Sequence, residues 1–565
     1  MSKIRKPLPI ILVALALLSS AAFAGPITID PTNPHYWNVN GQTIALVGVS
    51  GDYLCHVSCI TSPGTVCDLQ TRTNQTTVNT QDFLCRYESY PAYIADLKTR
   101  GLNKMRLYIG LNHSPGWQRA SPLNVPYDYE EAFPWNGAQW DMSTWSTPFF
   151  NRVRAVLTEA QNNGVYVEVT LFDPWDGDFQ FSPWNPNNNV QATGWSNRSY
   201  FASFQPGEVC PPVQNYGIAD PDPRRKQIAL LQRAVFRLND FNNIYWEIAN
   251  EPDLANPPNG VSPAAATAWH DCMVRQLYSY EAGQPNGHHA IAVHYHAKAS
   301  IDSLTNGSFP LSSPNVAVVN SHYASVSNGT PDPYGANPMI RDYNGGTFGQ
   351  LGRVFGFNEG RISPDLSQSP DRSDWSARAE AWEFMLNGGG TFDHLGYDWK
   401  SSSTAHNVRT RLGYLNTFLK SLSLQNMNRK LNNPQLPVSQ QLPAFILGGL
   451  PAYGTTSQFN GNTYWGAMQW DNNQFVLYVH HSTLSSESVK RYVPTSSGTF
   501  HHTLQLQLGA QQPAQFVAEW INPATNTVLN PPGVCINWNG VSYTLPQSPD
   551  YSFDVALRIK RMACS

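Results

Sequence analysis

Hydrophobic and polar residues follow two alternating patterns between residues 35 and 425. Short apolar runs, typical of strands buried on both faces, alternate with longer stretches in which apolar residues recur at helical spacing. The predicted strands are residues 44–50, 103–109, 165–172, 242–251, 290–295, 316–321, 353–357 and 390–395. The predicted helices are residues 90–100, 147–163, 222–239, 262–282, 297–304, 373–387 and 405–424. This alternation predicts an α/β fold, a parallel (β/α)8 barrel of the TIM type.

The pattern changes beyond residue 430, where a connector rich in Pro, Gln and Leu precedes strands of period two. One side of these strands is apolar, and the residues on it are Leu504, Leu506, Leu508, Phe553, Val555, Leu557 and Ile559. The residues between them, such as Asp554 and Ala556, are expected to face water. We therefore expect a barrel at residues 25–435 and a smaller antiparallel β-sandwich domain at residues 436–565.

The first 24 residues have the layout of a secretory signal peptide. Basic residues are followed by an apolar run at residues 10–18 and by small residues that end at Ala24. The apolar run is too short for a membrane span, and the sequence contains no other long apolar stretch. The sequence therefore predicts cleavage after Ala24, a secreted or periplasmic protein, and no membrane span.

The mature chain carries a mild negative charge. Removal of Lys3, Arg5 and Lys6 with the signal peptide leaves 36 − 3 = 33 Lys and Arg against 40 Asp and Glu, a net charge of −7. A mildly acidic chain without basic runs argues against nucleic acid as a partner.

Eight cysteines on an exported chain favour disulfides over metal or thiol chemistry. Half of them lie in a polar segment near residues 52–88, which we interpret as a disulfide-stapled insertion: Cys55, Cys59, Cys67 and Cys85. We expect two bridges among these four, one between Cys210 and Cys272, and one between Cys535 and Cys564, although the sequence alone leaves the connectivity open. At least three disulfides are predicted, because the insertion has too little apolar content to hold itself by burial.

Two glutamates at the ends of apolar strands carry the candidate chemistry. Glu251 ends the run Ile-Tyr-Trp-Glu-Ile-Ala-Asn-Glu before Pro252, and Glu359 stands 359 − 251 = 108 residues later in Asn-Glu-Gly. A carboxyl group at the mouth of an apolar strand lies where burial raises its pKa, as a proton donor near neutral pH requires. A pair of such carboxyl groups indicates glycoside hydrolysis.

The motif Asn250-Glu251-Pro252 after the fourth strand and Glu359 after the seventh resemble the motifs of the clan A glycoside hydrolases. These are retaining (β/α)8 glycosidases that include many cellulases, mannanases and xylan-acting enzymes. The resemblance covers roughly residues 35–425, and the closing strands are similar to the small β-sandwich that follows the barrel in several subgroups of the clan.

The resemblance implies an enzyme that cleaves O-glycosidic bonds of a plant-type or microbial poly- or oligosaccharide by double displacement, and the signal peptide implies that this enzyme is secreted. Glu251 would be the general acid/base and Glu359 the nucleophile, with carboxyl groups about 5 to 5.5 Å apart. Asn250 would bind the hydroxyl next to the anomeric carbon. Arg106, a charged residue inside a strand buried on both faces, would support the nucleophile and keep it ionised, the alternative being a purely structural ion pair.

The sixth strand ends in His322 and Tyr323, and either side chain could hydrogen-bond Glu359. In the clan, one residue separates these two residue types, whereas here they are adjacent. The sequence therefore leaves open which of the two points into the site. Asp173 and Trp175 follow the third strand, and they could contact or stack on sugar rings.

Trp399 after the eighth strand is a further candidate stacking platform, although single tryptophans more often lie in a core. His294 and His296 lie two residues apart after the fifth strand without an Asp/Glu-His signature, so hydrogen bonding is favoured over metal binding. No metal and no cofactor are predicted, and the expected partner is a carbohydrate substrate.

Two other function classes are alternatives. A non-catalytic carbohydrate-binding protein on a glycosidase scaffold is disfavoured by the presence of both Glu251 and Glu359. A metal-dependent hydrolase or a serine esterase lacks its motif here, because neither a metal-ligand signature nor Gly-x-Ser-x-Gly occurs in the sequence.

Overall fold

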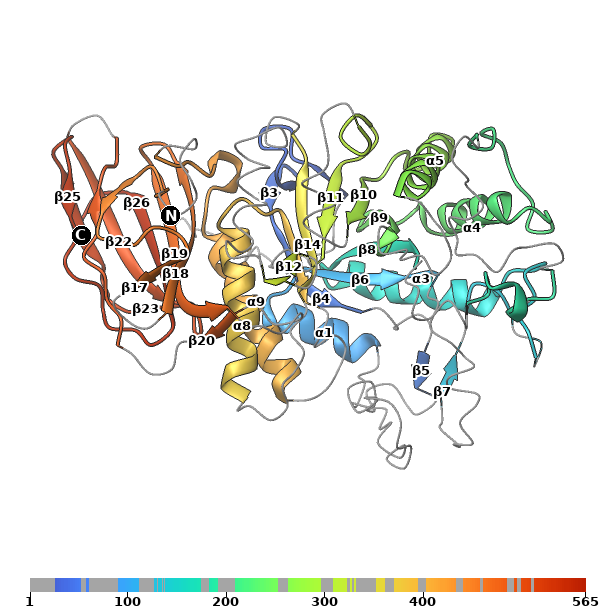
Figure 1. Cartoon of the computed structure of the whole chain (residues 1–565), viewed down its shortest axis with the longest axis horizontal. Coiled ribbons are helices and arrows are strands. Elements are labelled where there is room, and N and C mark those ends of the chain that lie inside the picture. Colours follow the sequence, from blue (N-terminus) through green and yellow to red (C-terminus); the bar gives the residue numbers. More distant parts are fainter. Residues whose placement is uncertain are drawn as a thin grey trace, which may run out of the picture.

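A computed structural model describes residues 26–51, 57–59, 90–110, 127–129, 131–134, 136, 138–173, 182–191, 209–252, 263–295, 308–322, 326–327, 330–331, 352–360, 370–394, 403–432, 441–457, 461–484, 492–494, 499–509 and 513–564. Figure 1 shows a barrel with surrounding helices and, at the left, an antiparallel β domain beside it. The expected signal peptide and the expected junction between residues 435 and 436 lie outside the described residues.

Eight parallel strands close into a barrel in which neighbours in space are neighbours in sequence. They are β4 (Leu46–Ser50), β6 (Lys104–Tyr108), β8 (Tyr166–Phe172), β9 (Ile244–Ala249), β10 (Ile291–Tyr295), β11 (Val318–Ser321), β14 (Val354–Gly360) and β15 (Thr391–His394). The last strand pairs with the first, Thr391 opposite Leu46. The predicted barrel is therefore confirmed, and β14 extends beyond its predicted end so that Glu359 lies within the strand.

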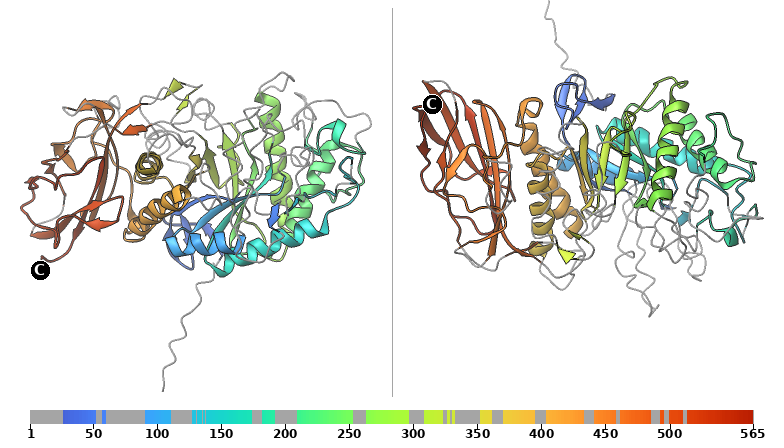
Figure 2. Two further views of the ribbon diagram at one scale, coloured as in Figure 1. Left: turned by 90° about the horizontal axis from the view of Figure 1, so that it is seen from below. Right: turned by 45° about the horizontal axis from the view of Figure 1, so that its top comes forward.

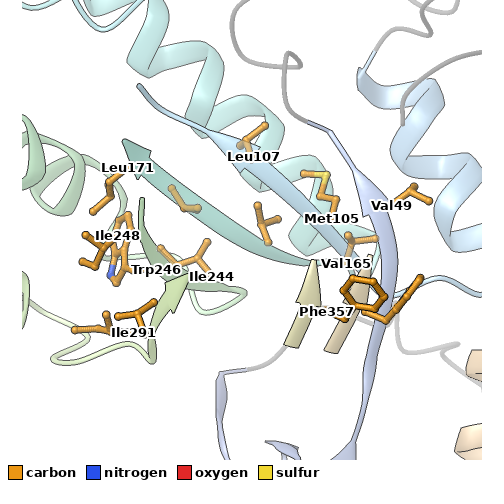
Figure 3. Packing of buried hydrophobic residues seen from close by; sticks show 14 of the residues in the cluster. Val49, Met105, Leu107, Val165, Leu171, Ile244, Trp246, Ile248, Ile291 and Phe357 are labelled. Carbon is orange, nitrogen blue, oxygen red and sulfur yellow. The ribbon is translucent and has the colours of Figure 1, made fainter. Parts of the chain in front are cut away.

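The barrel strands present apolar side chains outward and polar side chains inward. Figure 3 shows the outer layer, in which Met105, Leu107 and Trp246 pack among other buried hydrophobic residues. Their sequence neighbours Arg106 and Glu247 are equally buried on the inner side. The barrel interior is thus polar, whereas strands buried on both faces usually read as continuous apolar runs.

The helices described around the barrel are α1 (Tyr90–Arg100), α3 (Thr147–Asn162), α4 (Pro223–Leu238), α5 (Pro263–Glu281), α8 (Pro370–Met385) and α9 (Ser403–Lys420). Their ends carry local signals. The Ser146 hydroxyl accepts the Phe149 N–H at 3.3 Å, and Gly101 follows α1 with a φ of 84°, a left-handed conformation that favours glycine. The expected helix at residues 297–304 lies outside the described residues.

A small antiparallel sheet covers the amino-terminal end of the barrel. It consists of β1 (Ile27–Ile29), β2 (Trp37–Val39) and β3 (Gln42–Ile44). The Trp37 ring lies 4.7 Å from the ring of Tyr245, at the start of β9, within a buried cluster of residues from the starts of several strands. The opposite, carboxyl end of the barrel is where strand-end side chains such as Glu251 gather.

The second domain is an antiparallel β-sandwich, as predicted. Its larger sheet contains β17 (Thr455–Ser457), β18 (Gly461–Trp470), β19 (Gln474–Leu484), β26 (Asp554–Arg561), β22 (Ala514–Asn522), β23 (Thr527–Val528), β20 (Tyr492–Pro494) and β24 (Val534–Trp538). The smaller sheet contains β16 (Ile446–Gly448), β21 (Gln505–Leu506) and β25 (Tyr543–Thr544). Leu504, Leu506 and Leu508 share one buried cluster with Leu557 and Ile559.

The prediction that the alternate residues of the last strand face water is wrong for Asp554 and Ala556. Both are buried, and the Asp554 carboxylate accepts hydrogen bonds from Nε and Nη2 of Arg378 in α8 at 2.8 and 3.0 Å. The larger sheet lies against the helices of the barrel, which two views in Figure 2 also show. The barrel therefore covers the face that the alternation assigns to solvent.

Two of the predicted disulfides are confirmed. Cys210 is joined to Cys272 in α5, and Cys535 is joined to Cys564, with Cα atoms 5.4 and 5.5 Å apart. The bridges expected among the four cysteines near residues 52–88 lie outside the residues whose side chains are described. Within the described part of the chain, no helix combines the length and apolar character needed to cross a membrane.

Candidate active site

Glu251 follows β9 at the carboxyl end of the barrel in an unusual backbone conformation. Its φ is +46°, in the left-handed region that side chains other than glycine rarely adopt, and Pro252 follows directly. Its N–H donates to Nδ1 of His294 over 2.6 Å. Such conformations cost about 1 to 3 kcal/mol and cluster at functional sites. The surrounding structure therefore holds Glu251 in place at an energetic cost.

Glu251 is only 4% exposed, and its carboxyl group is hydrogen-bonded to the buried His322. Nδ1 of His322 lies 2.8 Å from Oε1 of Glu251, and Nη1 of Arg106 lies 3.4 Å from the other ring nitrogen, Nε2. An arginine can only donate, so Nε2 of His322 accepts and Nδ1 carries the ring proton. A neutral His322 thereby donates to Glu251 while Arg106 fixes its tautomer.

Asn250 is held from both sides of its carboxamide. Its Oδ1 accepts from Nη2 of Arg106 at 3.0 Å, and its Nδ2 donates to Oδ1 of Asp173 at 3.0 Å. Asp173 directly follows β8 and is almost fully buried. Arg106 and Asp173 therefore fix which end of the Asn250 amide is oxygen and which is nitrogen.

His294 and His322 lie against each other at the ends of β10 and β11. Their ring centroids are 3.6 Å apart, and both side chains are fully buried. His294 accepts the Glu251 N–H through Nδ1, so that nitrogen carries no proton. One histidine thus orients the backbone of Glu251 and the other its carboxyl group.

Glu247 is a central residue of this arrangement that the sequence analysis does not identify. Its Oε2 accepts from Nε and Nη2 of Arg106 at 2.8 and 2.5 Å and from the Thr170 hydroxyl at 2.7 Å. Its Oε1 accepts from Nδ2 of Asn320 at 3.0 Å and of Asn358 at 2.8 Å. Burial raises the pKa of Glu247 to about 7, although Arg106 acts in the opposite direction. The sequence does carry a signal for this residue, because Glu247 is a charged residue in the middle of the apolar strand β9.

A second ionic cluster lies deeper in the barrel. Nζ of Lys104 contacts Oε2 of Glu168 at 2.7 Å and also contacts the Asp393 carboxylate, and all three side chains are fully buried. Burial acts to lower the pKa of Lys104, but the carboxylates of Asp393 and Glu168 outweigh it and raise that pKa. Lys104 is therefore an ammonium group, and two cations, Lys104 and Arg106, face three interior carboxyl groups.

The structure brings together six of the predicted site residues around one end of the barrel: Glu251, Asn250, Arg106, Asp173, His322 and His294. Glu359 is described through its backbone in β14, which is parallel to β9 in the same closed barrel, so the two strands end on the same side. The contact expected between Arg106 and Glu359 remains a prediction. Trp175, Tyr323 and Trp399 lie outside the described residues.

A search of the described residues finds no group of three or more His, Cys, Asp or Glu side chains that could hold a metal ion. The chemistry that the described site can provide is that of a positioned carboxyl group, with hydrogen-bond donors and acceptors around it.

No family model and no curated protein matches this sequence. Similar folds occur among solved structures. A protein described as a glycoside hydrolase shares 11% sequence identity with this chain at a TM-score of 0.51, over 95% of this chain and 97% of its own. A glycoside hydrolase family 5 protein from Bacteroides vulgatus ATCC 8482 also shares 11% sequence identity with this chain at a TM-score of 0.51, over 95% of this chain and 93% of its own. Both likenesses concern the fold, barrel and second domain together.

Proposed function

We propose that this protein is a secreted glycosidase that hydrolyses O-glycosidic bonds of a plant-type or microbial poly- or oligosaccharide with retention of configuration. The observation that carries the proposal is the buried chain from Arg106 through His322 to Glu251, at the barrel end where β14 also brings Glu359. Paired glutamates on strands four and seven of such a barrel suit a double displacement. The fold shared with glycoside hydrolases agrees with this function.

In the first step, Glu251 acts as the general acid and Glu359 as the nucleophile. The Glu359 carboxylate attacks the anomeric carbon, the glycosidic C–O bond breaks, and the leaving oxygen takes the proton of Glu251. His322 donates to Oε1 of Glu251, so the proton to be transferred belongs on Oε2. The products of this step are a glycosyl ester on Glu359 and the released alcohol.

In the second step, water replaces the enzyme at the anomeric carbon. The Glu251 carboxylate removes a proton from the water as its oxygen attacks, and the ester bond to Glu359 breaks. The two inversions together give retention. The fixed amide of Asn250 would bind the hydroxyl next to the anomeric carbon, and Asp173 would act by holding that amide rather than by a contact of its own with the sugar.

The test begins with a screen of the purified protein on nitrophenyl glycosides and polysaccharides, and continues with two variants on the best nitrophenyl substrate. Glu359→Ala should lower turnover on every substrate, on the order of 10⁴-fold or more, because it removes the nucleophile. Glu251→Ala should retain far more of the first step, because a nitrophenyl group leaves without a proton.

Azide distinguishes the roles of the two glutamates. In Glu251→Ala, azide should attack the glycosyl ester and give an adduct of retained configuration, whereas in Glu359→Ala it should attack the substrate directly and give the inverted adduct. Glu519→Ala, in the second domain, is the control and should keep wild-type turnover. Near wild-type activity of Glu359→Ala, or adducts of exchanged configuration, would reject the assignment. Binding of polysaccharide without any turnover would favour the non-catalytic alternative.

A further inference from the structure

The polar interior of the barrel is connected to the site at its mouth through Arg106. On the interior side, Nε and Nη2 of this guanidinium both donate to one oxygen, Oε2 of Glu247. On the outer side, Nη2 reaches Asn250 at 3.0 Å and Nη1 reaches His322 at 3.4 Å. The guanidinium therefore contacts the interior carboxylate through Nε and Nη2, and the mouth residues Asn250 and His322 through Nη2 and Nη1.

The Glu247 carboxyl group receives hydrogen bonds from donors on four other strands. Five N–H or O–H groups of Arg106, Thr170, Asn320 and Asn358 reach its two oxygens. A protonated carboxyl group has an O–H of its own to place. Protonation of either oxygen therefore displaces or reverses at least one of these donors. Three of the five donors, two from Arg106 and one from Thr170, lie on Oε2.

We propose that Glu247 is a positioning residue that, as a carboxylate, holds Arg106 and through it the Asn250 amide and the His322–Glu251 pair. This inference rests on the proposed function, in which Glu251 acts as acid and base. Glu247 itself lies below the mouth and acts on the reaction through Arg106 rather than by a contact of its own with the sugar. Activity should consequently follow the ionised fraction of Glu247.

The ionisable groups around Glu247 favour such a dependence on pH. In the described interior, these groups are Arg106 and Lys104 on β6, Glu168 on β8, Tyr245 on β9, Asp393 on β15 and His322 after β11. Arg106 favours the charged form of Glu247, while burial and the Glu168 carboxylate oppose it. These opposing influences give Glu247 a pKa of about 7, so its protonated and ionised forms are both populated near neutral pH.

Glu247→Gln is the direct test, with Glu168→Gln as its matched control. Glu168 is equally buried, shares Asn320 with Glu247, and is paired with Lys104 instead of Arg106. We expect Glu247→Gln to lower kcat at least about 10-fold with KM nearly unchanged, measured on the best nitrophenyl glycoside of the screen. Its kcat/KM should also lose the acid limb near pH 7 and keep only a limb at lower pH, where the nucleophile Glu359 ionises. Glu168→Gln should keep the Glu247 limb, moved to lower pH because the Glu168 charge no longer opposes ionisation.

Thr170→Val is a gentler second variant that keeps the shape of the barrel. It removes the hydroxyl that donates to Oε2 over 2.7 Å, so Glu247 should ionise at higher pH, and the acid limb should move up by about one pH unit or less. A purely structural role of Glu247 would not move this limb. Equal losses of kcat in Glu247→Gln and Glu168→Gln, with wild-type pH profiles, would overturn the proposal.

A crystal structure of Glu247→Gln gives a readout that needs no substrate. The expected result is that Nη2 of Arg106 moves out of hydrogen-bonding range of Asn250, whereas Glu168→Gln keeps that contact at its 3.0 Å. An unchanged Arg106 in Glu247→Gln would overturn the positioning role. If the wild type hydrolyses no glycoside, the proposed function fails and this structure alone decides the role of Glu247.

Discussion

Two deeply buried arginine–carboxylate pairs among the described residues differ in geometry. Arg378 and Asp554 join α8 of the barrel to β26 of the second domain, and each nitrogen donor meets a separate oxygen, at 2.8 and 3.0 Å. In the barrel, both donors of Arg106 meet the same oxygen of Glu247. The first geometry is the two-pronged pairing that planar guanidinium and carboxylate groups favour. The second leaves Arg106 able to reach Asn250 and His322.

This difference indicates what each pair does. The Arg378–Asp554 pair, to which the Tyr478 hydroxyl also donates at 2.9 Å, binds one domain to the other. The Arg106–Glu247 pair holds side chains at the barrel mouth. The same residue types at similar burial therefore contribute to cohesion at one place and to the site at the other, where the Arg106 guanidinium also contacts Asn250 and His322.

The largest effect expected at the domain junction is on stability. Arg378→Met leaves the Asp554 carboxylate buried without its guanidinium partner, which should cost about 3 to 5 kcal/mol in the free energy of unfolding. Chemical denaturation measures this loss, and kcat per folded molecule should stay at the wild-type value. The double variant Arg378→Met, Asp554→Asn should regain more than half of the loss, because the neutral amide still accepts from Tyr478. A fall in kcat in either folded variant would show that the two pairs are not separate in function.

A smaller effect should appear in the pH dependence of stability. The pKa of Glu247 is raised from its ordinary 4.5 to about 7 in the folded chain. The folded state then binds more protons than the unfolded state between these values, so the stabilising contribution is complete below pH 4.5 and is lost as pH rises through 7.

The size of this loss is roughly 3 kcal/mol. Glu247→Gln cannot titrate, so its unfolding free energy should change less than that of the wild type between about pH 5 and about pH 8. If the unfolding free energy of wild type and variant changed equally with pH, Glu247 would not change its charge in this range.

Much of the barrel could be predicted because its strands are short, apolar and separated by capped helices. The end of β9 also carried a readable signal, since Asn250, Glu251 and Pro252 stand directly after a run with no turn residues. The polar interior was harder to foresee. Lys104 and Arg106 stand at alternate positions of β6, as do Glu168 and Thr170 in β8, which indicates an inward polar face. Their partners, however, depend on the closure of the barrel.

The face of the second domain that the barrel covers could not be predicted from the alternation of polar and apolar residues. Asp554 alternates with Val555 as it would on a strand with one face in solvent. The sequence around it does not show that the helix with Arg378, 176 residues earlier, covers that face. Glu247 was not predicted as a site residue for a similar reason. Its hydrogen-bond donors Asn320 on β11 and Asn358 on β14 lie far from it in the sequence.

The central claim, that Glu251 and Glu359 act together in a double displacement, is tested most directly by proton NMR of the first sugar released from a substrate of known anomeric configuration. The spectrum must be recorded before mutarotation mixes the anomers. The account predicts that the first-formed product has the configuration of the substrate, because two inversions at one carbon cancel. Initial release of the opposite anomer would contradict the account, since it would mean a single displacement by water.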